Sequence, residues 1–217
     1  MKRFVFRFLS MITGICLYSL GIVITIKANI GYSPWDVLHA GIAQTIGMSI
    51  GTVVIVVGLV ILVLVVVLGE KFGFGTLSNM VMIGVLIDII LFLDFIPIAQ
   101  GLIFGIPMLI TGLFVISLAI YFYIKSGFGA GPRDNLMVVL SRKTKIPAGV
   151  CRCIIELLAT FFGWLLGGMV GIGTVISVIA IGFCIQITFW ALKFDVTSVK
   201  HETLRETFDS IRTGSSS

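Results

Sequence analysis

Hydrophobic residues run along this chain in long blocks separated by charged residues. Four blocks are free of charge over 19, 30, 30 and 36 positions, namely 8–26, 40–69, 95–124 and 157–192. A shorter block, 72–87, ends at Asp88, after which the apolar run resumes. A helix of about 20 apolar residues crosses the roughly 30 Å hydrocarbon core of a bilayer. Because lipid offers no partner to backbone amides, the pattern predicts an integral membrane protein built from helices.

We predict an all-α polytopic fold with six spanning helices, at about 8–28, 50–69, 76–96, 102–125, 147–168 and 174–193. Two further short, interrupted helices are expected at about 34–46 and 132–142, after the first and fourth spans. Lysine and arginine gather on one side of these spans, and the other side carries only Lys27. Positive residues mark the cytoplasmic side, so both termini are predicted to be cytoplasmic.

Composition supports the membrane class and excludes several others. Hydrophobic residues make up 58% of the 217 residues and charged residues 12%, against about 25% charged in soluble proteins. This excludes a disordered chain, a disulfide scaffold and a soluble nucleic-acid binder. The four cysteines, Cys16, Cys151, Cys153 and Cys184, fall in or beside predicted helices, which indicates buried thiols. No metal-ligand spacing occurs, and we expect neither a metal nor a cofactor.

The chain repeats itself at a distance of 98 residues. Residues 10–92 align without a gap on 108–190, with 23 identities in 83 pairs, seven of which are glycines. Each copy holds three predicted spans, so the second copy enters the membrane from the opposite side. This predicts an inverted-topology repeat, with 1–100 as the first half, 101–193 as the second and 194–217 as a cytoplasmic tail.

The first repeated motif follows the first and fourth spans. It reads Gly31-Tyr32-Ser33-Pro34-Trp35-Asp36 in one copy and Gly129-Ala130-Gly131-Pro132-Arg133-Asp134 in the other. One interpretation is helix punctuation: glycine ends a helix, Ser33 or Gly131 caps the next, proline begins it, and aspartate meets its free amides. The other is a broken helix whose N-terminus faces a ligand. The residues that exceed what capping needs are Trp35, His39, Arg133 and Asn135.

The second repeated motif precedes the third and sixth spans. It reads Gly73-Phe74-Gly75-Thr76 and Gly171-Ile172-Gly173-Thr174, and we expect each threonine to be the N-cap of its helix. Exposed helix N-termini can also hold an anion, although turn formation is the simpler interpretation. No βαβ context accompanies these glycines, so a dinucleotide site is rejected.

Polar residues inside spans give the candidate binding site. Counting along the helices places Asp88, Glu156 and Gln186 roughly 14–18 Å from the helix ends, near one depth at the bilayer midplane. Arg152 lies one turn from Glu156 on the same helix face. Charges at this depth are costly, at about 2.5–3.5 kcal/mol each, and are rarely kept without a function. The alternative is an Arg152–Glu156 or Arg152–Asp88 pair that only stabilises the bundle.

These motifs resemble the YczE/YyaS/YitT family of bacterial membrane proteins over about residues 10–190. The matching segments are Pro34-Trp35-Asp36-Val37-Leu38-His39, Gly75-Thr76-x-x-Asn79, Gly84-x-x-x-Asp88, Gly129-Ala130-Gly131-Pro132-Arg133-Asp134-x-Leu136-Met137, Arg152-x-x-x-Glu156, and residues 163–174. The resemblance implies a location in the bacterial cytoplasmic membrane and adds Asn79 to the candidate site. It implies the YczE branch, without the soluble C-terminal domain of YitT-like members. It implies little chemistry.

The sequence favours a secondary transporter of a small anionic or zwitterionic solute that works by alternating access. Its site would be lined by Asp88, Arg152, Glu156 and Gln186, with Asp88 or Glu156 as carrier of a coupling proton. A channel-like facilitator and a membrane adaptor without transport stay open as alternatives. No nucleophile–base pair or metal-ligand cluster lies in a span, so an enzyme is not expected. A homodimer is plausible from the thin bundle, but no residue pattern decides it.

Overall fold

The computed structural model describes residues 2–70, 72–129 and 131–194, apart from the side chains of residues 2–4 and 148. The elements in these ranges are α1 Lys2–Lys27, α2 Pro34–Ile46, α3 Ile50–Val67, α4 Phe74–Leu93, α5 Gly101–Ser126, α6 Pro132–Thr144, α7 Ala148–Leu165 and α8 Ile172–Ala191. The predicted long and short helices are confirmed, most of them within three residues. The proposed tail after Phe194 lies outside the described residues.

Five of the described helices are long and apolar enough to cross a membrane. They are α1 from Val5, α3, α4, α5 and α8. The 18-residue helix α7, which carries Arg152 and Glu156, is not among them. The chain is thus an all-helical, polytopic membrane protein.

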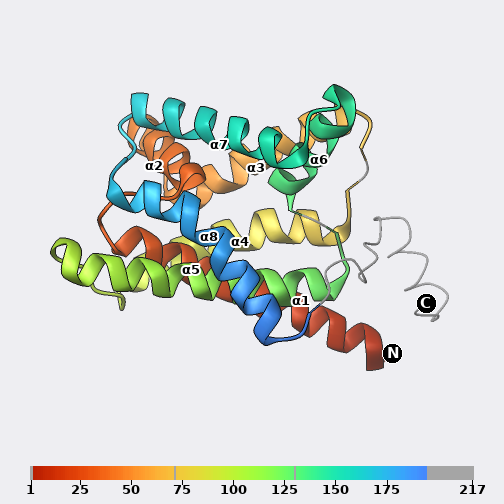
Figure 1. Ribbon diagram of the computed structural model, residues 1–217, viewed down its shortest axis with the longest axis horizontal. Helices are drawn as coiled ribbons and strands as arrows, with labels where there is room; N and C mark the ends of the chain where they lie inside the picture. The colour runs from red at the N-terminus through yellow and green to blue at the C-terminus, as the bar shows by residue number, and fades with distance from the viewer. Residues whose placement is uncertain (1, 71, 130, 195–217) are drawn as a thin grey trace.

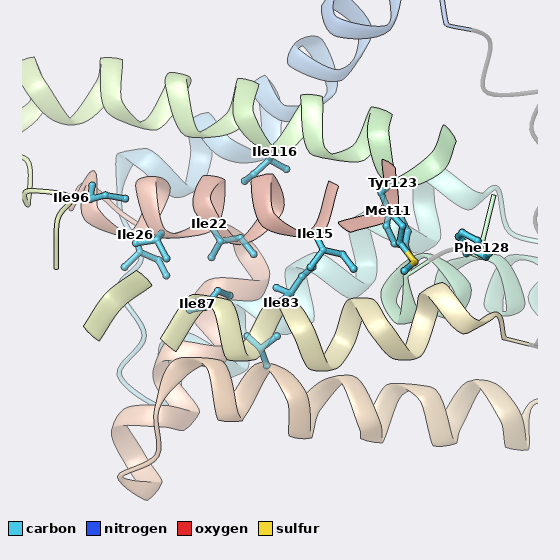
Figure 2. Packing of buried hydrophobic residues seen from close by; sticks show 12 residues of the cluster. Met11, Ile15, Ile22, Ile26, Ile83, Ile87, Ile96, Ile116, Tyr123 and Phe128 are labelled. Atoms are coloured by element: carbon cyan, nitrogen blue, oxygen red, sulfur yellow. The ribbon is translucent and has the colours of Figure 1, made fainter. Parts of the chain in front are cut away.

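Helices α1 and α5 make the most extensive helix–helix contact of the described residues and run side by side in opposite directions (Figure 1). Glycines let the two backbones approach closely: a Cβ added at Gly14 would lie 2.8 Å from the Tyr123 amide nitrogen. Helix α4 packs on α1, and α8 packs on α5. Figure 2 shows the main apolar core between α1, α4 and α5, where Ile15 and Ile87 are fully buried.

The two short helices lie towards opposite ends of the molecule (Figure 1). Each packs on a long helix from the other half of the chain, α2 on α7 and α6 on α3. The two halves therefore exchange their short helices rather than folding as separate bundles.

The repeated turns also dock across the two halves. The Gly173 amide donates to the Ile30 carbonyl at 2.7 Å, and the Gly75 amide donates to the Phe128 carbonyl at 2.9 Å. Gly31 and Gly129, with φ near +117° and +116°, come so close to the partner turn that a Cβ would lie within about 3 Å of its backbone. The first repeated motif of each half thus packs against the second repeated motif of the other half.

The assignment of Thr76 and Thr174 as N-caps was wrong. The N-caps are Gly73 and Gly171, and the threonines stand three residues further on, where their Oγ1 atoms accept from the N-cap amides at 3.3 and 3.2 Å. The helices begin earlier because the glycines adopt the extended cap conformation and the threonines supply the reciprocal half of a capping box.

Candidate polar site between the two halves

The site begins at the first turn of α2. Pro34 occupies the first helical position, Ser33 is the N-cap and Asp36 is the third helical residue, as predicted. The Ser33 hydroxyl, however, donates to Asp36 Oδ2 and makes no cap bond to the backbone. The Asp36 carboxylate is buried. It accepts a hydrogen bond from Ser33 and lies at the N-terminus of a helix, where negative charge is favoured.

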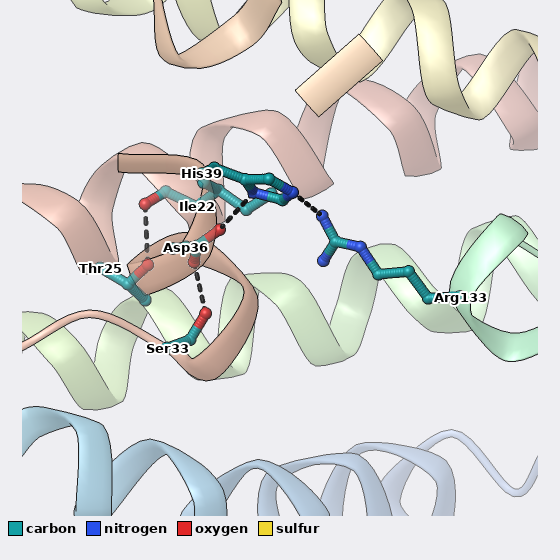
Figure 3. A network of polar contacts seen from close by, with 6 residues as sticks. All are labelled: Ile22, Thr25, Ser33, Asp36, His39 and Arg133. Atoms are coloured by element: carbon teal, nitrogen blue, oxygen red, sulfur yellow. Dashed lines mark hydrogen bonds and ion pairs between the residues drawn. The ribbon is translucent and has the colours of Figure 1, made fainter. Parts of the chain in front are cut away.

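His39 lies one turn beyond Asp36 and is completely buried. Its Nδ1 is 3.7 Å from Asp36 Oδ1, and its Nε2 is 3.3 Å from a terminal nitrogen of Arg133 (Figure 3). A guanidinium can only donate, so Nε2 accepts and the proton of the neutral ring sits on Nδ1, facing Asp36. Burial also lowers the pKa of His39 to about 4, so the ring is neutral at physiological pH.

Arg133 comes from the first turn of α6, in the other half of the chain. Its guanidinium lies 4.7 Å from the centre of the Trp35 ring, and that ring stacks on His39 with a centroid distance of 6.3 Å. Trp35 and Arg133 occupy equivalent positions in the repeat. Arg133 in the first turn of α6 therefore contacts the first two turns of α2, through a cation–π contact with Trp35 and a hydrogen bond with His39.

Tyr18, Asp134 and Arg152 interact electrostatically with one another, and Tyr18 also interacts with Asp36 and Arg133 of this contact. Tyr18 is half-buried in the middle of α1. We call Tyr18, Trp35, Asp36, His39, Arg133, Asp134 and Arg152 the polar cluster. Tyr18 was missed by the sequence analysis, and its only signal there is a phenol in the middle of an apolar span.

Asn79, from the family resemblance, and Asn135, from motif one, are the remaining candidates. The Asn79 Oδ1 of α4 and the Asp134 Oδ2 both approach Gly131, at 3.8 and 3.6 Å from a Cβ built there. Asn135 is half-buried in the first turn of α6. Asn79 and Asp134 therefore both approach the N-cap residue of α6.

The three polar residues predicted at one depth, and Arg152 one turn from Glu156, do not come together as a single site. Asp88 accepts from the Gly51 amide at 2.8 Å and from the Ser49 hydroxyl, and so binds the N-terminus of α3. Arg152 and Glu156 form the predicted ion pair, at 2.8 Å on α7. Gln186 is exposed on α8. Depth along a helix does not fix the direction in which a side chain faces, and no extensive packing joins the described parts of α4, α7 and α8.

The fold and the polar cluster, in which Asp36 and His39 are buried, define a helical membrane protein with polar contacts between the two halves of the chain. Residues 5–189 match a family of unknown function, DUF6198, and the chain belongs to this family. It is 32% identical to the uncharacterized membrane protein YczE of Bacillus subtilis (strain 168), over 85% of this chain and 86% of the relative.

Two further relatives have the same extent. The chain is 29% identical to an uncharacterized protein of Haemophilus influenzae, over 80% of this chain and 81% of the relative. It is 27% identical to the uncharacterized protein YyaS of Bacillus subtilis, over 80% and 88%. No solved structure matches the chain.

Proposed function

We propose that this protein is a secondary transporter of a small anionic or zwitterionic solute. In this proposal α7 is the sixth span, the two halves form an inverted repeat, and both termini face the cytoplasm of a bacterial cell. Inverted repeats with interrupted helices and an interior polar site are the usual construction of alternating-access carriers.

One observation carries the proposal: Arg133 from one half binds His39 of the other half, beside its cation–π contact with Trp35. Helix N-termini and guanidinium groups favour a negative group on a solute. The carboxylates of Asp36 and Asp134 stand among the same residues, so a solute that also carries a positive group is matched better than a simple anion.

Glu156 is the best candidate for a proton-coupling group. It is half-buried and paired with Arg152, so its charge and the pairing of Arg152 would change together on protonation. Asp88 is less suited to that role, because it is engaged with the N-terminus of α3.

The proposal is tested by a thermal-stability screen of the purified protein in detergent, at two pH values. The probes are inorganic phosphate, acetate, glycine, glutamate and, as a cation, choline. A probe present at a hundred times its dissociation constant stabilises the folded state by about 2.7 kcal/mol. We expect glutamate or glycine to raise the unfolding temperature and choline to leave it unchanged.

Two arginines on the same helix make a matched pair for this screen. Arg133→Gln removes the polar-cluster guanidinium, whereas Arg142→Gln removes an exposed guanidinium that pairs with Glu70 at 2.9 Å. We expect the first variant to lose the probe-induced shift and the second to keep it. Equal shifts in both variants would contradict a site at Arg133, and uptake of the stabilising probe into liposomes then tests transport directly.

A further inference from the structure

Two glycines in the second half have open space where their repeat partners are tightly packed. In the first half, α3 lies on α4 at Gly51 and Gly84: a Cβ at Gly51 would lie 2.0 Å from the Gly84 carbonyl oxygen. Their repeat partners on α7 and α8 are Gly149 and Gly182. Among the described residues, a Cβ at either of these meets nothing within 4 Å.

The faces that flank these glycines are also open. On α8, Val178, Gly182 and Gln186 follow one another at helical spacing and are all exposed. On α7, Cys153 is exposed in the turn after Gly149. Helices α7 and α8 pack mainly on other helices, α2 and α5 respectively, and no extensive contact joins the described parts of α7 and α8. Side chains that would form an α7–α8 contact are thus present but unused.

We propose that α7 and α8 close against each other in a second conformation, through Gly149 and Gly182, as α3 and α4 do here. A glycine inside a helix destabilises that helix by about 0.5–1 kcal/mol relative to alanine, and close backbone approach is a reason to keep it. The packed pair in the first half demonstrates such an approach for this repeated motif.

Gln186 has a defined place in the closed arrangement. Its repeat partner Asp88 accepts from the Gly51 amide at the start of α3. The amide oxygen of Gln186 can accept in the same way from the Gly149 amide at the start of α7. Being neutral, it would bind that helix end more weakly than a carboxylate, which suits a contact that forms and breaks.

The closure would cover the side of the polar cluster on which Arg152 lies. The Arg152 side chain is 47% exposed on α7, so movement of α7 onto α8 would bury it. If the closure acts as a gate at one end of a solute pathway, that role rests on the proposed transport function. The closure itself can be tested without any solute.

The native Cys153 supplies half of the test. Its repeat partner Ile55 lies against Gly84, 2.5 Å from a Cβ built there, so a cysteine at 182 would meet Cys153 when the helices close. The test chain carries Gly182→Cys with Cys16, Cys151 and Cys184 changed to alanine. It is oxidised in membrane vesicles with copper phenanthroline and oxygen, and free thiols are then counted with a maleimide mass tag.

We expect a disulfide within one chain, seen as the loss of both taggable thiols without a change in oligomer mass. The control retains Cys153 and the native Cys184, which is buried on another face of α8, and should keep both thiols. Adding Gly149→Leu to the test chain introduces a large side chain that would block the closed α7–α8 contact. In the present conformation this side chain would point into open space. The substitution should preserve the fold and restore both thiols.

Three results would overturn the closure: two free thiols in the test chain, equal oxidation in the Cys184 control, or a disulfide that joins two chains. The last would assign this face to a dimer instead. Uptake without the disulfide would refute the gate and leave transport standing. The disulfide in a protein that neither binds nor moves any probe would refute transport and leave the closure standing.

Discussion

In the first half of the chain α3 lies against α4, whereas in the second half the corresponding helices α7 and α8 stand apart. Both halves carry the same glycine pair, so the pair permits the contact without enforcing it. The difference lies in the neighbouring positions. Val54 and Gly58 of α3 correspond to Arg152 and Glu156 of α7, and a closed α7–α8 contact must bury an ion pair, which costs desolvation energy.

Substitutions at Gly51 and Gly149 test the difference between the two halves most directly, because Gly51 is tightly packed and Gly149 is not. Gly51→Ala would place a methyl group 2.0 Å from a backbone oxygen, and we expect it to cost about 1–3 kcal/mol of stability. Gly149→Ala meets open space in the first turn of α7 and should change stability by less than about 0.5 kcal/mol. Thermal unfolding in detergent checks both, and equal destabilisation by the two variants would contradict the open second half.

The second prediction concerns pH and compares α2 with α6, where Met137 takes the place of His39. The folded pKa of His39 is about 4, below its unfolded value of about 6.5. The unfolded chain therefore binds the proton first, and stability falls as pH is lowered. We expect a loss of about 2 kcal/mol between pH 7.5 and pH 5.

His39→Gln is the control for that pH effect, because glutamine does not titrate and can still accept from Arg133. This component of the pH dependence should vanish in His39→Gln, whatever the other titrating groups contribute. Identical pH profiles of unfolding temperature in the two proteins would show that His39 is not buried in its neutral form.

The third prediction compares the helix-end contacts of Asp88 and Gln186. Asp88→Ala removes the acceptor of the Gly51 amide and of the Ser49 hydroxyl at the start of α3, and should cost about 1–2 kcal/mol. Gln186→Ala removes an exposed side chain and should change stability by less than about 0.5 kcal/mol. Unfolding temperatures measured side by side check this, and a large effect of Gln186→Ala would mean that α7 and α8 are already in contact.

The smallest expected effect on stability belongs to the Arg152–Glu156 pair. The arginine side chain is 47% exposed, and pairs four residues apart on a helix contribute about 0.3–0.5 kcal/mol. Glu156→Gln should therefore barely change the unfolding temperature. If solute uptake is established, the same variant should lose its pH dependence, and unchanged proton-driven uptake would exclude Glu156 as the coupling group.

Part of this structure could be predicted from the sequence because the information is local. Charge-free blocks, Pro34 and Pro132, and the glycines around them gave the helices and their interruptions. The spacing of four residues gave the Arg152–Glu156 pair. The role of Asp88 could not be predicted in this way, because its partners, Ser49 and Gly51, lie some 40 residues earlier on another helix.

The sequence by itself determined that the chain is helical, enters a membrane and repeats after 98 residues, because hydrophobicity, helix breakers and identity are properties of short segments. Only the tertiary structure decided that each repeated turn docks on the other half, that Arg133 meets His39, and that one glycine pair is packed while its twin is open. These features depend on which helix faces lie together. Contacts between segments far apart in the chain set that arrangement, and the same short motif is compatible with more than one arrangement.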